Sequence, residues 1–195
     1  MADRLASGTA CPAARLPRVA LRFFPPAPLL NRLLLQEFER ASSSPNVVRS
    51  HFFHDRFENI MLPPSSAPML SPVLAEALRH AGRLLGTHPR GLRIGGWFNA
   101  MRPGDVTSLH RHDDGGEWLS GVYYVSAPWR SGDLVLHLSD GALRLTPRAG
   151  SFVFFPPDLP HEVERHEGSA LRLSVGFNIG PAAPGQMNRE TAADR

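Results

Sequence analysis

The sequence predicts a mainly β domain of α+β type, with a jelly-roll or double-stranded β-helix core and N-terminal supporting helices. From about residue 92 onward, short apolar runs alternate with Gly, Pro and Asp, which is typical of an all-β fold. Two segments before this region carry apolar residues at helical spacing. With 195 residues, of which 42% are hydrophobic and 20% charged, the chain can bury one sizeable core. We expect one domain over residues 26–179, a partly irregular segment over 1–25 and a flexible tail over 180–195.

Both predicted helices precede the β region and are interpreted as supports for a sheet. The first covers Leu29–Phe38, where the leucines and the phenylalanine fall on one helical face. The second has Ser71 as its N-cap and stops at Gly86, a residue that suits the end of a helix. After Ser42–Pro45 the chain is expected to be irregular until the second helix begins.

The strands of the β region can be placed one by one. An edge strand near Val19–Phe24 comes first, and eight strands follow after residue 92. The eight are Ile94–Met101, Val106–His112, Leu119–Val125, Leu134–Leu138, Leu143–Thr146, Ser151–Phe155, His161–Glu164 and Leu171–Ile179. Eight such strands favour two sheets that enclose a cavity.

Composition excludes several classes of protein. Because Cys11 is the only cysteine, a disulfide and a thiolate metal cluster are excluded, and any metal must be held by His, Asp or Glu. No apolar run approaches the roughly 18 residues that span a bilayer, so we expect a cytoplasmic protein without a membrane partner. The net charge of +3 comes from singly scattered arginines, which argues against nucleic acid. The composition is compatible with a homodimer.

Three histidines and a nearby carboxylate are the candidate metal ligands. His110 and His112 are two residues apart on a predicted strand, so they share one face, which Asp114 joins if the strand continues. His161 follows a proline-rich turn that aims it back at the cavity. Two histidines and one carboxylate leave three positions open on one side of Fe(II), where O2 and a bidentate co-substrate can bind. Zinc is less favoured, because the sequence has no helical His-Glu-x-x-His unit.

The last predicted strand carries an arginine that needs an anion. Apolar residues alternate along Leu171–Ile179 and leave Arg172, Ser174 and Asn178 on the other face. The planar fork of an arginine matches a carboxylate, and Ser174 can donate one more hydrogen bond to it. The far carboxylate of 2-oxoglutarate is the natural candidate.

Seven short motifs follow one another between positions 97 and 174. They are Trp97-Phe-Asn99, Arg102-Pro-Gly-Asp105, His110-Arg-His112, Ser120-Gly-Val-Tyr-Tyr-Val125, Gly150-Ser-Phe-Val-Phe-Phe-Pro156, His161-Glu-Val163 and Arg172-Leu-Ser174. In this order they resemble the core of the Fe(II)/2-oxoglutarate-dependent oxygenases, in particular the bacterial oxygenases related to prolyl hydroxylases. Such oxygenases often have a glycine six positions before the first metal histidine, and Gly104 stands six before His110.

The sequence departs from the usual His-x-Asp of these oxygenases, and three assignments of the metal ligands stay open. His110 with His112 gives a site of three histidines together with His161. His112 with Asp114 restores His-x-Asp, whereas His110 with Asp114 needs a bent strand.

The resemblance implies an Fe(II)- and 2-oxoglutarate-dependent dioxygenase that hydroxylates a small molecule or a peptidyl side chain and releases succinate and CO2. Its cofactor is Fe(II), and its co-substrates are 2-oxoglutarate and O2. Asn99 is expected to face the cavity and touch the co-substrate. Of the neighbouring Tyr123 and Tyr124, which alternate faces, one packs in the core and the other, assigned as Tyr124, lines the cavity.

Two other classes share the predicted barrel. Gly104-x5-His110-x-His112-x4-Glu117 and Gly150-x5-Pro156-x4-His161 also resemble the two cupin motifs, in which Glu117 is a fourth metal ligand. Arg172 argues against a cupin, because a cupin has no need of a clamp for a co-substrate carboxylate. The third class is a non-catalytic ligand-binding protein that has kept the barrel and lost the acidic ligand.

Overall fold

Two antiparallel sheets form the body of the molecule, which the computed structural model describes over residues 19–24, 27–112 and 116–183. The order of the seven-stranded sheet is β1-β9-β6-β11-β4-β3-β2, and that of the four-stranded sheet is β5-β10-β7-β8. The seven strands are β1 (Ala20–Phe23), β2 (Val48–Phe53), β3 (Arg56–Met61), β4 (Leu92–Met101), β6 (Leu119–Ser126), β9 (Ser151–Phe155) and β11 (Arg172–Pro181). The four are β5 (Thr107–His110), β7 (Leu134–Leu138), β8 (Gly141–Leu145) and β10 (His161–Val163).

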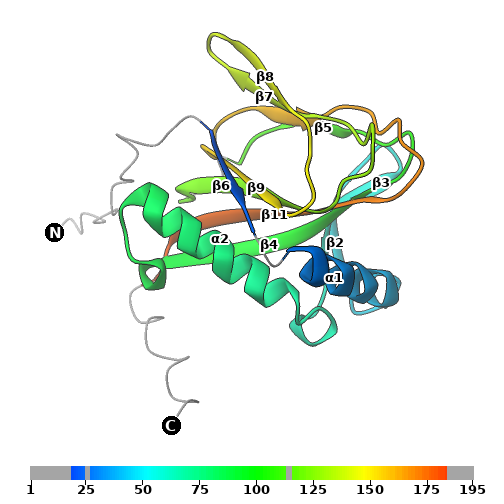
Figure 1. The fold of residues 1–195 in the computed structure, drawn as a ribbon, viewed down its shortest axis with the longest axis horizontal. Helices are drawn as coiled ribbons and strands as arrows, with labels where there is room; N and C mark the ends of the chain where they lie inside the picture. The colour runs from blue at the N-terminus through cyan, green and yellow to red at the C-terminus, as the bar shows by residue number, and fades with distance from the viewer. Residues whose placement is uncertain (1–18, 25–26, 113–115, 184–195) are drawn as a thin grey trace, which may run out of the picture.

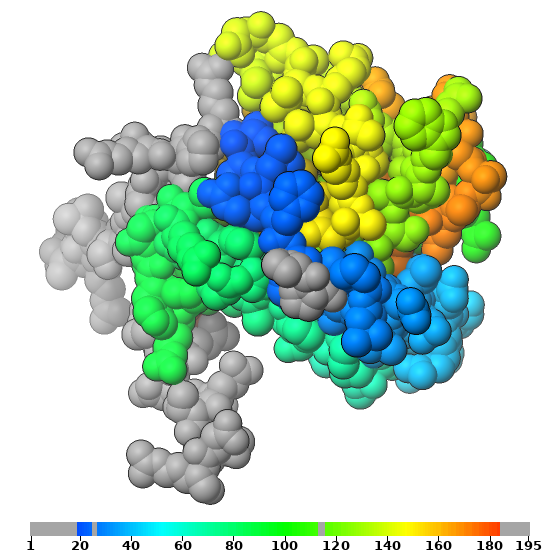
Figure 2. All heavy atoms as spheres, in the orientation of Figure 1, coloured from blue at the N-terminus to red at the C-terminus, as the bar shows by residue number. Residues whose placement is uncertain are grey.

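Two helices support one face of the larger sheet. Figure 1 shows α1 (Ala27–Ala41) and α2 (Leu70–Leu85) on this face, with the smaller sheet over the opposite face. Leu34, Phe98 and Phe177, which come from α1, β4 and β11, are fully buried in the core between the helices and the sheet. Figure 2 shows β1, in blue, at the surface beside the yellow segments around β9, with which it pairs. The helices thus cover this face of the larger sheet, and its other face looks toward the smaller sheet (Figure 1).

A second, smaller core lies between the two sheets. It includes Met101, Tyr124, Leu136 and Phe155, all nearly inaccessible to solvent. The central strand of the larger sheet, β11, pairs with β4 on one side and β6 on the other. This register brings residues far apart in the sequence to the same level between the sheets.

The predicted β region is confirmed. Each of its eight expected strands corresponds to one of β4–β11, with ends that shift by one or two residues, and β1 confirms the expected edge strand. Both predicted helices are present as well, and Gly86 ends α2 in a left-handed conformation, at φ 64°. Two short 3-10 turns, Pro64–Ser66 and Pro89–Gly91, precede α2 and β4.

The expectation of an irregular stretch after Ser42–Pro45 is wrong, because β2 and β3 form a hairpin there. The hairpin turn places His54 and Asp55 at φ 49° and 59°, a left-handed conformation that usually selects Gly or Asn. Most side chains of β2 are exposed, so the strand lacks the alternation of a half-buried strand. The hairpin therefore lacks both sequence signals that predict one, a Gly or Asn in the turn and an alternation of apolar and polar residues along β2.

Ser71 does not cap α2, contrary to the prediction. The N-cap residue is Met69, and Ser71 lies inside the first turn. The side chain of Glu37, on α1, accepts a hydrogen bond from the Met69 amide at 3.0 Å. A carboxylate that is distant in the sequence thus accepts a hydrogen bond from a backbone amide at the start of the helix, in place of the predicted serine hydroxyl.

Several predictions concern the ends of the chain. β11 continues to Pro181, so the strand enters the segment expected to be a tail, while residues 1–18 and 184–195 lie outside the described residues. The division into a segment 1–25, a domain 26–179 and a tail 180–195 stays a prediction. Neither α1 nor α2, the helices of the described part of the chain, is long and apolar enough to cross a membrane.

Candidate metal and anion site

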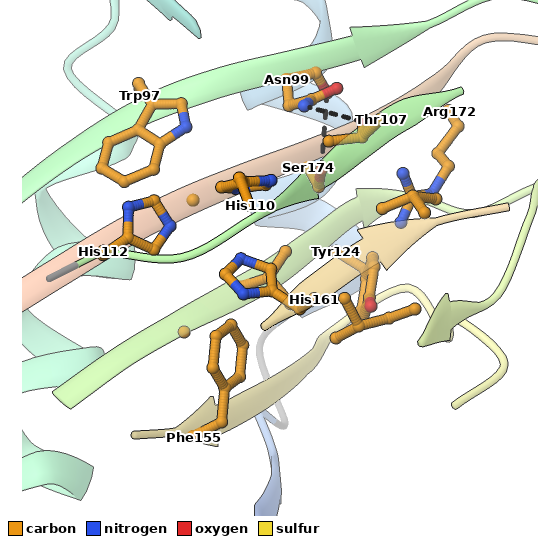
Figure 3. A pocket seen from close by; sticks show the side chains of 15 residues that line it. Trp97, Asn99, Thr107, His110, His112, Tyr124, Phe155, His161, Arg172 and Ser174 are labelled. Carbon is orange, nitrogen blue, oxygen red and sulfur yellow. Dashed lines mark hydrogen bonds between the residues drawn. The ribbon is translucent and has the colours of Figure 1, made fainter. Parts of the chain in front are cut away.

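A cavity between the two sheets contains most of the residues singled out in the sequence. Figure 3 shows its histidines at one end and Arg172 at the other, with Asn99, Tyr124 and Ser174 along the walls. The floor comes from the larger sheet and the roof from β5 and β10 of the smaller one. Of the nine histidines in the sequence, only His110, His112 and His161 line this cavity.

Strand pairing brings the first two histidines together. His161 on β10 stands opposite His110 on β5, although 50 positions separate them. Their ring centroids are 4.2 Å apart. His112 follows two residues after the end of β5, and its amide donates a hydrogen bond to the Pro157 carbonyl at 2.7 Å. The turn before β10 therefore holds the backbone of His112 beside the other two histidines.

The three imidazoles form a cluster that can hold a metal ion. One ring nitrogen from each lies within 4.8 Å of the other two. Nδ1 of His110 is 2.7 Å from the Ser108 carbonyl oxygen, and Nδ1 of His161 is 2.9 Å from that of Leu159. Because a carbonyl only accepts, each Nδ1 must carry the proton, which leaves the lone pair on Nε2. A hydrogen bond from the ring nitrogen that does not bind the metal is how proteins orient metal-binding histidines.

The electrostatics of the cluster favour a neutral ring at His161. The pKa of His161 is lowered to about 3, mainly by burial and also by repulsion from His110 and His112, while the hydrogen bond to the Leu159 carbonyl opposes this shift. A neutral imidazole is the form that binds a metal. Imidazole ligands suit Fe, Zn, Cu and Ni, so the donor set fits the predicted iron.

Arg172 lies at the other end of the cavity and is fully buried. Its guanidinium carbon is 5.4 Å from the centroid of the Tyr124 ring, and one terminal nitrogen contacts the Met101 sulfur. Burial lowers the pKa of Arg172, and the nearby Tyr124 raises it. Within the described residues, no carboxylate lies at ion-pair distance from this guanidinium. Its Nε and the Tyr124 hydroxyl are both buried without a hydrogen-bond partner there.

The other predicted cavity residues have defined neighbours. Ser174 is buried, and its hydroxyl is 3.4 Å from the Asn99 carbonyl on the facing strand β4. Tyr124 lines the cavity, whereas Tyr123 points to the helix side and donates a hydrogen bond to Asn31 Oδ1 at 2.6 Å. The predicted alternation of the two tyrosines is thus observed.

Arg56 on β3 supports the cavity wall and escaped the sequence-based prediction. Its guanidinium donates to Asn99 Oδ1 at 3.2 Å, to Thr107 Oγ1 at 2.8 Å and to the Val106 carbonyl at 2.8 Å. Burial lowers the pKa of Arg56, while the nearby carboxylates of Glu58 and Asp105 raise it. Arg56 was missed because the hairpin that carries it was not predicted.

The structure bears unequally on the three open ligand assignments. It brings His110, His112 and His161 together, as the three-histidine assignment requires. Asp114 lies outside the described residues, so the two assignments that use it stay predictions. Glu117, the fourth ligand in the cupin interpretation, is not in the described cluster and pairs with Arg93 at 3.4 Å.

Solved structures with a similar fold exist for this chain. A scan against protein-family models and a search of the curated proteins each gave no match. A prolyl-4-hydroxylase from Pseudomonas putida is 23% identical, with a TM-score of 0.68 over 87% of this chain and 95% of that chain. The α-ketoglutarate-dependent carbocyclase SnoK of nogalamycin biosynthesis is 13% identical, with a TM-score of 0.69 over 86% and 81%. The epimerase SnoN, solved with Fe3+, α-ketoglutarate and nogalamycin RO, is 12% identical, with a TM-score of 0.66 over 93% and 88%.

At sequence identities of 12% to 23%, the structural similarity establishes the fold alone. The chain has the double-stranded β-helix fold of non-haem Fe(II)/2-oxoglutarate oxygenases, which confirms the fold class predicted from its strand pattern. What the cavity binds and does is a separate question, which depends on its own residues.

Proposed function

We propose that this chain is an Fe(II)- and 2-oxoglutarate-dependent dioxygenase that hydroxylates a small molecule or a peptidyl side chain. The observation that carries the proposal is that one cavity holds both a three-histidine cluster and a buried arginine without a carboxylate partner in the described residues. A metal site alone needs no such arginine. A buried guanidinium is costly unless an anion meets it, so a co-substrate with a carboxylate explains both features.

The histidines are the residues that hold the metal in this proposal. The Ser108 and Leu159 carbonyls fix the Nδ1–H of His110 and His161, so that both Nε2 atoms are oriented before a metal arrives. His112 supplies the third nitrogen. Iron bound there would contribute a Lewis acid for the keto-acid end of 2-oxoglutarate and redox chemistry for O2.

Arg172 and its neighbours would hold the far carboxylate of the co-substrate. The guanidinium offers a two-pronged donor, with the Ser174 hydroxyl on the same strand and the Tyr124 hydroxyl on the paired strand β6. The surrounding apolar side chains, Met101, Leu134 and Val163, keep water away from this ion pair. The overall reaction consumes O2, 2-oxoglutarate and one C–H bond of the substrate, and it yields succinate, CO2 and an alcohol.

The proposal predicts stoichiometric metal binding and turnover of 2-oxoglutarate. Purified protein should bind one Fe(II), or Mn(II) as a substitute, and should convert 2-oxoglutarate to succinate only with Fe(II) and O2 present. His161→Ala removes a central ligand and should abolish both properties. His137→Ala is the matched control, because this histidine lies on the neighbouring strand and pairs with Glu162 away from the cavity.

Calorimetric metal titrations and succinate assays on the three proteins decide the question. Metal binding by His161→Ala with wild-type affinity would contradict the site. Tight metal binding by the wild type without any affinity for 2-oxoglutarate would contradict the oxygenase and indicate a metal-binding barrel of another class.

A further inference from the structure

Trp97 occupies a space in the cavity that exists because residue 176 is a glycine. The two residues face each other on β4 and β11. A Cβ atom on Gly176 would lie 2.7 to 2.9 Å from three atoms of the indole ring, which is closer than real Cβ contacts. The absent side chain therefore lets the indole lie across the central strand of the larger sheet.

From this position the indole contacts His112. The centroids of the two rings are 5.6 Å apart, and the planes are tilted by 52°. Figure 3 shows the indole beside His112 at the metal end of the cavity, on the side away from His161. The other two imidazoles lie at similar distances, 5.1 Å for His110 and 5.2 Å for His161. His112 is thus packed between the indole and the two other candidate ligands.

The three histidines differ in how the fold holds them. His110 and His161 belong to paired strands, and a backbone carbonyl orients each ring. His112 stands two residues beyond the end of β5, where its amide donates to the Pro157 carbonyl and its ring contacts the indole of Trp97. A large rigid ring packed beside its imidazole removes directions in which that imidazole could turn away from the cluster.

We propose that Trp97 is a positioning residue for His112 as a metal ligand, and that Gly176 is required to admit its ring. The inference rests on the proposed metal site and goes beyond it, because it assigns to a residue that binds no metal a role in metal affinity. Supporting residues around a metal site typically contribute about 10- to 100-fold to affinity.

The test is a set of Co(II) and Mn(II) titrations followed by calorimetry and by the visible spectrum of bound Co(II). Trp97→Leu should weaken binding about 10-fold or more and change the Co(II) spectrum, because one nitrogen ligand is lost or displaced. Trp97→Phe, which keeps an aromatic ring against His112, should recover most of the affinity. Trp129→Leu is the matched control, since this indole is 85% exposed and lies outside the cavity.

Two further variants separate positioning from a general effect on folding. In a His112→Ala background, Trp97→Leu should cost less than about 2-fold, because the residue it positions is gone. Gly176→Ala should weaken metal binding in the wild type by displacing the indole, and should have a much smaller effect in the Trp97→Leu background.

The outcomes distinguish this inference from the proposed function. Wild-type metal affinity and an unchanged Co(II) spectrum in both Trp97→Leu and Gly176→Ala overturn the inference and leave the metal site standing. An equal loss in the presence and absence of His112 also overturns it. A wild-type protein that binds no metal overturns the proposed function and, with it, the inference.

Discussion

At the scale of single residues, Arg172 is the side chain whose surroundings most need a ligand. It is 1% exposed, one terminal nitrogen contacts the Met101 sulfur, and its Nε and the Tyr124 hydroxyl are both buried without a hydrogen-bond partner in the described structure. An unpaired buried charge lowers the stability of the folded state. An anion that enters the cavity would remove this penalty, so Arg172 should contribute to co-substrate affinity.

Replacing Arg172 by Met keeps most of the volume and removes the charge. Because the loss of a buried charge pair costs on the order of 2–5 kcal/mol, we expect 2-oxoglutarate to bind the Mn(II) form roughly 30-fold more weakly or worse. Metal affinity itself should persist, because a guanidinium cannot ligate a cation. The measurement is an anaerobic titration with 2-oxoglutarate.

Arg144→Met is the control for this experiment, since Arg144 is an exposed arginine that pairs with Glu164 outside the cavity. It should bind 2-oxoglutarate like the wild type. Equal affinity in Arg172→Met would exclude the clamp and remove the main reason for preferring an oxygenase over a cupin.

At the scale of elements, the hairpin β2–β3 links the larger sheet to the strand that carries His110. Arg56 on β3 bonds to Asn99 on β4 and to Thr107 on β5, and the neighbouring Glu58 accepts a hydrogen bond from the Ser108 amide at 3.2 Å. The Arg56 and Glu58 side chains are only 11% and 6% exposed and stand 3.6 Å apart. The hairpin, together with the pairing of β5 with β10, therefore holds β5 and the metal end of the cavity in place.

Arg56→Met should destabilise the protein. Removing one partner of a buried ion pair costs on the order of 3–5 kcal/mol, which for a chain of this size lowers Tm by on the order of 10 °C. Thermal unfolding followed by circular dichroism measures the effect. Arg56→Met should lower Tm by less in a Glu58→Gln background, because that background has no Glu58 carboxylate to be left without its partner. A Tm within about 2 °C of the wild type would show that the hairpin does not depend on this network.

At the scale of the whole molecule, the cavity lies between two sheets that different parts of the chain assemble. Ligands that bind only the folded barrel must stabilise all of it, because the three histidines and Arg172 come together only there. At about 100 times the dissociation constant, a bound ligand adds about 2.7 kcal/mol. For this chain length that raises Tm by roughly 5–10 °C.

Mn(II) together with 2-oxoglutarate should therefore raise the Tm of the wild type, and a chelator should reverse the change. In His161→Ala the same additions should leave Tm where it was. Differential scanning fluorimetry at a series of ligand concentrations gives the comparison, and an equal rise in both proteins would place the binding elsewhere.

The sequence by itself determined the β region and much of the cavity. Strand periodicity placed β4–β11 and put Arg172 and Ser174 on the face away from the apolar residues, because a strand alternates its side chains wherever it lies. His110 followed from its two-residue spacing to His112 on a predicted strand and His161 from the proline-rich turn before it, and the resemblance to the oxygenases supplied the expected chemistry. These features are local, so the residues that encode them are neighbours in the chain.

Only the tertiary structure decided which distant residues complete the site. His112 reaches the cluster from beyond the end of β5, and the turn before β10 holds its backbone there. Arg56 lies on a hairpin whose turn has no glycine. Trp97 reaches His112 because the residue opposite Trp97 on the paired strand is Gly176. The physical reason is that strand register and the packing of one sheet on the other bring together residues that are far apart in the chain. Such contacts leave no periodic pattern in the sequence.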